Sequence, residues 1–163
     1  MKHWQTGLVV VGLVAACLSA ADPLKIKRIP LAGLTEISVL VEPISPGFEK
    51  TFDREEFQTA VELRLRRAGI KVVEPDPKAS KPCLIVNLNM MRAEETPITA
   101  CSIRLDFYQQ ALLARDPSIK NYFGTWESHG IITVGESKLR EIENAMLRYV
   151  DIFANDFLAA NQK

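Results

Sequence analysis

Residues 137–160 read SKLREIENAMLRYVDIFANDFLAA, and this stretch decides the fold. Apolar side chains recur in it at steps of three and four, at Leu139, Ile142, Met146, Tyr149, Val150, Phe153 and Phe157. The opposite side of the same helical turn pattern is polar, with Arg140, Glu141, Asn144, Arg148, Asp151 and Asn155. The pattern predicts one long amphipathic helix. Because such a helix is stabilised mainly by burying its stripe, we expect it to lie on a sheet formed by the middle of the chain.

The middle of the chain predicts that sheet. Three strands are expected, at residues 83–91, 100–113 and 122–134. The connections between them, residues 92–99 and 114–121, are short and each contains a proline. Since parallel strands need a long crossover, these short links favour an antiparallel meander.

A second helix is expected before the meander. Asp53 and Glu56 have the spacing of a capping box, and Phe52 and Phe57 stand where a hydrophobic staple needs them. Gly69 fits the left-handed position that follows a helix. The helix is therefore predicted to start after Asp53 and to end just before Gly69.

Two further strands flank this helix in sequence. Residues 36–42 are apolar on both faces, as in a central strand, and a short strand is expected at 71–74. The whole order predicts an α+β fold, a two-layer sandwich of order β-α-β-β-β-β-α with two helices on one face of a mostly antiparallel sheet. The domain is expected to span residues 34–163, preceded by a proline-containing, basic tether over residues 22–33.

Side-chain alternation assigns the two faces of the meander. The apolar face collects Leu84, Val86, Leu88 and Met90 from one strand and Cys101, Ile103, Leu105 and Phe107 from the next. Directly opposite residues share a face, so Cys83 lies on the other face from Cys101 and no disulfide is expected between them. In the third strand the same logic points Tyr122, Gly124, Trp126, Ile132 and Val134 towards the helices, although a bulge at a glycine would reverse the assignment beyond it.

The other face of the meander is polar. It is expected to collect Asn87, Arg104, Asp106, Tyr108, Glu127 and His129. One interpretation is a simple solvated sheet face, which antiparallel sheets commonly have. The alternative is a recognition surface for a partner protein or a ligand.

The N-terminus has the pattern of an export signal, expected over residues 1–21. Lys2 precedes an apolar run at residues 7–16, which is short for a membrane-spanning helix, and small residues follow. Val14-Ala15-Ala16-Cys17 resembles the lipobox of bacterial lipoproteins, which implies cleavage before Cys17 and acylation of that cysteine. Leu18 resembles the outer-membrane sorting pattern of such lipoproteins. The alternatives are ordinary cleavage after Ala21 and an uncleaved anchor.

The composition and the motifs of the chain argue against several functions. The 163-residue chain has a formal net charge of +0, which does not suggest nucleic-acid binding. It contains no Gly-rich phosphate loop and no paired Cys or His spacing for zinc, so no cofactor or metal is expected. Cys83, Asp106 and His129 are the components of a Cys/His hydrolase, but a flat, solvated sheet supplies no oxyanion hole.

The order of the predicted elements resembles small bacterial envelope domains, such as outer-membrane assembly lipoproteins and the N-terminal domain of the Tol-system β-propeller protein. This resemblance is topological and implies no activity. The leading hypothesis is a non-catalytic envelope lipoprotein, anchored in the outer membrane, that binds or scaffolds a membrane-associated protein. The alternatives are a soluble periplasmic domain that holds a small ligand between helices and sheet, and the Cys/His hydrolase.

Overall fold

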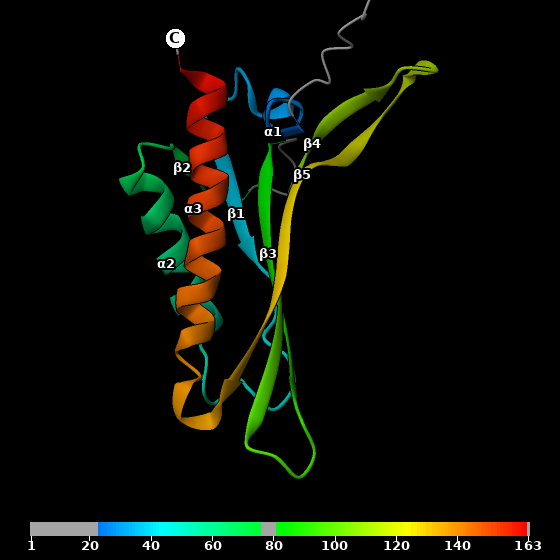
Figure 1. Cartoon of the computed structure of the whole chain (residues 1–163). Helices are drawn as coiled ribbons and strands as arrows, with labels where there is room; N and C mark the ends of the chain where they lie inside the picture. Colours follow the sequence, from blue (N-terminus) through cyan, green and yellow to red (C-terminus); the bar gives the residue numbers. More distant parts are fainter. Residues whose placement is uncertain (1–22, 76–80, 163) are drawn as a thin grey trace, which may run out of the picture.

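The computed structural model of the chain describes residues 23–75 and 81–162. The expected export signal, including Cys17, lies outside them. The described residues form one sheet with helices packed on one of its faces (Figure 1). The helical elements are α1 (Pro23–Arg28), η1 (Ile29–Leu31), α2 (Arg54–Arg67), η2 (Glu136–Lys138) and α3 (Glu141–Asn161). The strands are β1 (Ile37–Val41), β2 (Val72–Val73), β3 (Cys83–Arg92), β4 (Ile98–Leu113) and β5 (Asp116–Gly135).

The α+β class predicted from the sequence is confirmed. The sheet has the order β2-β1-β3-β4-β5, in which β3, β4 and β5 form the expected antiparallel meander. β1 lies parallel to both β2 and β3, which makes it the central strand that its two apolar faces predict.

Helix α3 lies across the sheet and closes the core. Ile142, Met146, Val150 and Phe153 are fully buried, as the periodicity of the stretch predicts. The Phe153 ring contacts Phe107 of β4, with centroids 5.3 Å apart. The helix begins at Glu141 and not at residue 137, because residues 136–138 form the separate short turn η2.

The predicted cap at Asp53, the Phe52–Phe57 contact and the left-handed Gly69 are present at the ends of α2, but the hydrogen bonds of the described residues do not include the return bond from Glu56 that completes a capping box. The Asp53 side chain accepts a hydrogen bond from the Glu55 backbone N–H at 2.7 Å, and the Phe52 and Phe57 rings stack with centroids 5.4 Å apart. At the other end Gly69 has φ +88°, and the Ile70 N–H donates to the Leu65 carbonyl at 3.1 Å. This backbone bond satisfies a carbonyl of the last turn and stops the helix before β2.

The register of β3 and β4 matches the faces assigned from sequence. Leu84 pairs with Phe107, and Met90 with Cys101. Cys101 is buried under the helices, whereas Cys83 pairs with Tyr108 on the opposite, open face. Both cysteines are free thiols, as the expected register requires.

Strand β5 departs from the expected register at a bulge. Phe107 pairs with Trp126 but Tyr108 pairs with Gly124, so Thr125 is an extra residue. Trp126 is buried against the helices as expected. The expectation that Tyr122 and Gly124 also face the helices is wrong, because the bulge places Gly124 opposite Tyr108 on the open face and moves Tyr122 with it.

The expected loop at residues 114–121 is also wrong, because β5 already begins at Asp116. Pro117 is compatible with this strand, since β5 is the edge of the sheet and one side needs no ladder donor. Residues 110–122 form a two-stranded ribbon that extends beyond β3 and that we call the arm. It projects from the body of the domain (Figure 1), and none of its residues is buried.

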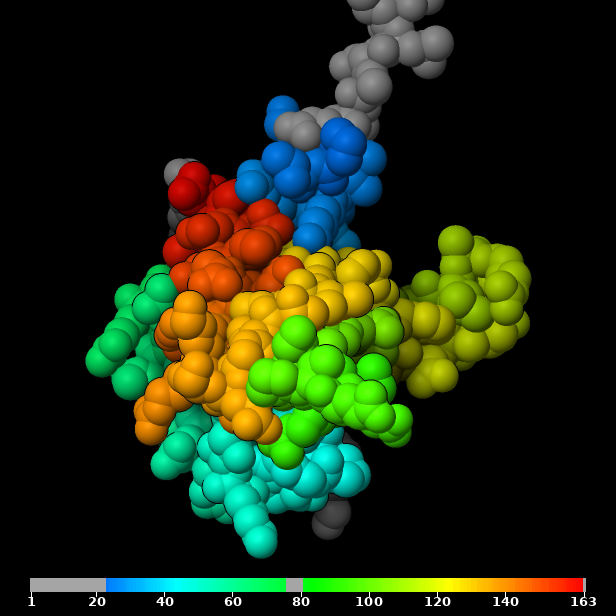
Figure 2. Space-filling view, turned by 60° about the horizontal axis from the view of Figure 1, so that its bottom comes forward, coloured from blue at the N-terminus to red at the C-terminus, as the bar shows by residue number. Residues whose placement is uncertain are grey.

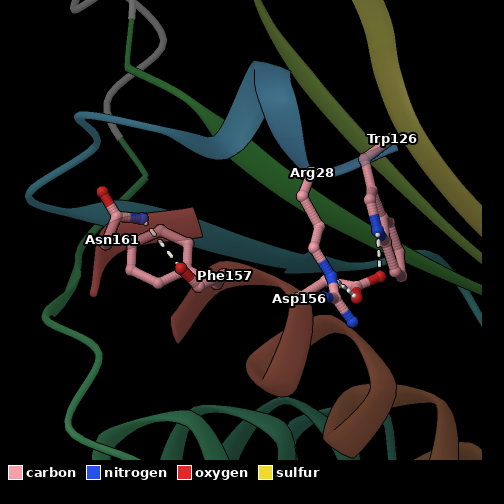
Figure 3. Close-up of polar contacts among 5 residues, drawn as sticks. All are labelled: Arg28, Trp126, Asp156, Phe157 and Asn161. Atoms are coloured by element: carbon pink, nitrogen blue, oxygen red, sulfur yellow. Dashed lines mark hydrogen bonds and ion pairs between the residues drawn. The ribbon is translucent and has the colours of Figure 1, made fainter. Parts of the chain in front are cut away.

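The expected tether over residues 22–33 is folded in its described part. Leu31 is fully buried, and the Arg28 side chain forms an ion pair of 2.7 Å with Asp156 of α3 (Figure 3). The Gly33 N–H donates to the Asn161 side chain at 2.8 Å. Both partners, Asp156 and Asn161, lie near the C-terminal end of the sequence. The local sequence of residues 22–33 therefore does not indicate that this segment packs on α3.

Candidate functional site

The open face of the sheet brings all six predicted surface residues together. Three strands contribute them in neighbouring rows: Asn87, Arg104 and His129 lie side by side, and Asp106 pairs with Glu127 in the next row. Tyr108 follows in the third row, opposite Gly124. We call Asn87, Arg104, Asp106, Tyr108, Glu127 and His129 the open-face cluster.

Arg104 is the centre of the open-face cluster. Its Nε lies 2.7 Å from Asp106 Oδ2, and its Nη2 lies 3.8 Å from Glu127 Oε2. The hydrogen bond to Asp106 is the main cause that raises the pKa of the Arg104 guanidinium. Two carboxylates around one cation leave this part of the face with a local excess of negative charge.

Amides and a further carboxylate extend the open-face cluster along β3. The Asn87 side-chain amide donates to Glu42, which follows β1, and the Asn89 amide donates to the Asn87 oxygen at 2.8 Å. A cleft of about 300 Å³ follows this edge of the cluster; it is lined by Glu42, Ile85, Asn87, Asn89, Arg104, Asp106 and Tyr108. Alternating donors and acceptors of this kind suit hydrogen bonding to a polar partner surface.

A larger cleft of about 640 Å³ continues from Arg104 to α1. It is lined by Lys27, Arg104, Asp106, Tyr108, Gly124, Thr125, Trp126 and Glu127. Lys27 Nζ lies 4.4 Å from the centroid of the Trp126 ring, within the range of a cation–π contact. The sequence reasoning missed Lys27 and Thr125, because Lys27 belonged to the expected tether and Thr125 reaches this cleft only through the bulge.

The Cys83, Asp106 and His129 constellation is not assembled. Cys83 lies on β3 and His129 on β5, two strands and four residues along the sheet apart. Sheet geometry puts about 10 Å between these strands and about 13 Å along them, far beyond hydrogen-bond reach. Burial raises the pKa of the Cys83 thiol, partly offset by a hydrogen bond with Ser38. A neutral thiol without a nearby imidazole is a poor nucleophile.

Residues 23–75 and 81–162 show neither a metal-binding cluster nor a membrane-spanning helix. No three His, Cys, Asp or Glu side chains in them lie close enough together to hold a metal ion. Nor does the described chain include a helix with the length and apolar character needed to cross a membrane.

No protein-family model matches the sequence, and no curated protein matches it. Among solved structures, the dodecameric PelC of Paraburkholderia phytofirmans is similar at 12% identity, covering 81% of this chain and 91% of that chain, with a TM-score of 0.47. The hypothetical protein CT253 of Chlamydia trachomatis has 8% identity, covering 78% and 100%, with a TM-score of 0.45. A minor lipoprotein of Acinetobacter baumannii has 10% identity, covering 77% and 92%, with a TM-score of 0.27. Similarities this distant carry no information about activity.

Proposed function

We propose that this chain is an exported, lipid-anchored binding module that recruits a membrane-associated protein through its open-face cluster. One observation carries the proposal. A charged arginine with two carboxylates, an amide and a phenol lie together on one exposed sheet face, whereas the opposite face is sealed by helices. Exposed polar groups of both charges, next to clefts, can fix the orientation and the register in which a partner protein binds.

The packing of the helix layer favours this proposal over an internal ligand site. The space between the helices and the sheet is occupied by fully buried side chains, which include Phe107, Phe153, Leu105, Ile142 and Met146. A small-molecule pocket normally needs about 300 Å³ or more of enclosed space. The two clefts described above lie at the open-face cluster. A third cleft, of about 340 Å³, lies between α3 and the edge strand β5, but it is not enclosed, because its lining residues Ile131 and Ile152 are exposed to solvent.

The open-face cluster is tested by charge reversal. Arg104→Glu and Glu127→Arg each place like charges side by side in the open-face cluster. In intact cells, the wild-type chain is expected to crosslink to a partner protein, and we expect either variant to abolish that crosslink. Arg67→Glu is the matched control, because Arg67 is an exposed arginine at the end of α2, away from the open-face cluster. If the crosslinked protein is retained by both cluster variants, or lost equally with Arg67→Glu, the open face is not the recognition surface.

The lipid anchor is tested separately at Cys17. The lipobox-like sequence and the apolar run before it support acylation of this residue. Several acyl chains hold a protein stably on a membrane, so Cys17→Ser is expected to block normal processing or to weaken the attachment of the chain to the membrane fraction. Sedimentation of the wild-type chain with outer-membrane fractions would agree with the outer-membrane sorting pattern that Leu18 resembles. Unchanged processing and attachment of Cys17→Ser would favour cleavage after Ala21 or an uncleaved anchor.

A further inference from the structure

One end of the molecule exposes several large apolar side chains. Ile26 and Ile29 of α1 and η1 are 54% and 68% exposed. On the arm, Leu112 and Ile119 are 57% and 42% exposed, and Tyr122 is 39% exposed. Figure 1 shows that α1 and the tip of the arm lie towards the same end of the domain, and the space-filling view shows them well separated from each other (Figure 2). We call these two segments the apolar pole.

The arm is the part of the domain that would gain most from contact with another surface. Residues 110–122 pair only with each other, since β3 ends its pairing with β4 at Tyr108. An isolated two-stranded ribbon is marginally stable in water, and this one has no buried residue. Exposed Leu112 and Tyr122 therefore stand on a ribbon that would gain stability from contact with an apolar or amphipathic phase.

The charge of the apolar pole is mainly basic. α1 contains Lys25, Lys27 and Arg28 and no acidic residue. Asp156 of α3 compensates the charge of Arg28, so the positive charge of α1 comes from its two lysines. The arm contains Arg115 and Lys120 against one acidic residue, Asp116, whose pKa is lowered by hydrogen bonds from Ser118. Apolar side chains interleaved with lysine and arginine are the composition that binds the interface of an anionic bilayer.

The position of α1 in the chain favours a membrane as the surface that covers the apolar pole. Pro23, where α1 begins, follows the proposed anchor Cys17 by only six residues. Six residues reach at most about 20 Å even when fully extended. An acylated Cys17 would therefore keep α1 close to the headgroups, with the arm directed to the same side.

We propose that the apolar pole lies against an anionic membrane surface, with Ile26, Ile29 and the tip of the arm inserted at the interface. Leu112 pairs with Lys120, so Leu112 and Ile119 lie on opposite faces of the ribbon, and the tip of the arm enters the interface end-on. This inference rests on the proposed lipid anchor for its orientation. In that position α1 and the tip of the arm are two separated contacts, which fix the tilt of the domain. The open-face cluster would then point in a defined direction relative to the bilayer.

The test uses a chain without the acyl group, so that the apolar pole is measured independently of the anchor. Residues 17–163 with Cys17→Ser retain every residue of the described fold and are mixed with vesicles of phosphatidylethanolamine and phosphatidylglycerol. We expect co-sedimentation with these vesicles, and less with vesicles of phosphatidylcholine alone. Leu112→Glu and Ile29→Glu are each expected to lower the partition constant about tenfold. Each variant removes one aliphatic side chain that is inserted in the membrane interface when the chain is bound.

Met91→Glu is the matched control, since Met91 is 69% exposed but lies on β3, outside the apolar pole. The proposal is overturned if the chain does not sediment more with anionic than with neutral vesicles, or if Met91→Glu lowers binding as much as Leu112→Glu. Sedimentation without vesicles that is lost in Leu112→Glu would show that a second copy covers the arm, which also overturns it. Binding to anionic vesicles together with unchanged N-terminal processing of Cys17→Ser in cells would leave the apolar pole standing and remove only the anchor.

Discussion

The indole N–H of Trp126 donates a hydrogen bond of 3.0 Å to Oδ2 of Asp156, and both side chains are buried (Figure 3). The other carboxylate oxygen of Asp156 accepts from Arg28 Nε at 2.7 Å. One carboxylate thus joins the edge strand, the last helix and the N-terminal segment. A buried carboxylate is tolerated only when it is paired and hydrogen-bonded, and here both oxygens have a donor.

We expect Asp156→Ala to lower the free energy of unfolding by about 3 kcal/mol. The variant leaves the Trp126 N–H buried without an acceptor and removes the partner of Arg28. Asp151→Ala removes a second Arg–Asp pair from the same helix, the bidentate contact to Arg64. Because that pair is exposed, its loss is expected to cost no more than about 1 kcal/mol. Urea denaturation of both variants makes the comparison, and equal costs would show that burial of Asp156 is unimportant.

Phe153→Ala should cost about 3–5 kcal/mol, because its ring is fully buried between Phe107 and Trp126. Asn155→Ala, on the exposed side of the same helix, should change the free energy of unfolding by no more than about 0.5 kcal/mol. Denaturant midpoints of the isolated chain give both values. A Phe153→Ala midpoint equal to that of the wild type would contradict the docking of α3 on the sheet.

Cys101 is expected to make stability fall at alkaline pH. Burial raises the pKa of its thiol from 9.0 to about 11, so the thiolate forms more readily in the unfolded chain. A raised folded-state pKa gives a contribution that is complete below the unfolded pKa and is lost as pH rises from about 9 to about 11. Urea midpoints at about pH 8 and about pH 10.5 measure the fall. Cys101→Ala should show a smaller fall, and an unchanged fall would assign it to other groups.

Gly130 is expected to be intolerant of a side chain. A Cβ at this position would stand 1.9 Å from the Tyr149 hydroxyl oxygen and 3.0 Å from its Cζ, so Tyr149 of α3 packs directly over the β5 backbone. Gly130→Ala should destabilise the fold by about 1–3 kcal/mol, and combining it with Tyr149→Phe should recover part of the loss. Gly124→Ala is the control, since its Cβ would meet Tyr108 at an ordinary 3.8 Å. Thermal melts that show equal losses for both alanines would refute the close contact.

Local patterns predicted much of the fold. The stripe of the last helix, the cap at Asp53, the left-handed Gly69 and the pairing of even β3 positions with odd β4 positions all depend on neighbours in sequence or on strict alternation. The six residues of the open-face cluster followed from the same alternation. They are close in the structure because alternation holds over the rows in which they lie.

The errors arose where one local event or one distant contact decides the structure. The bulge at Thr125 inverts the faces of everything before it in β5. Gly124, which adjoins it, indicates from sequence that a bulge is possible here, but not that one forms or which residue is the extra one. The N-terminal segment docks through Arg28 on Asp156, which a local pattern does not reveal. A signal for Asp156 was present, because this acidic residue interrupts the apolar surface between Phe153 and Phe157.

The contact between Arg28 and Asp156 joins residues 128 positions apart in the chain. Closing so long a loop costs entropy before any contact compensates for it, so this junction should form after the meander and after α3 has docked. Interactions absent from the folding transition state act mainly on the rate of unfolding. We therefore expect that weakening this contact speeds unfolding and leaves the folding rate nearly unchanged.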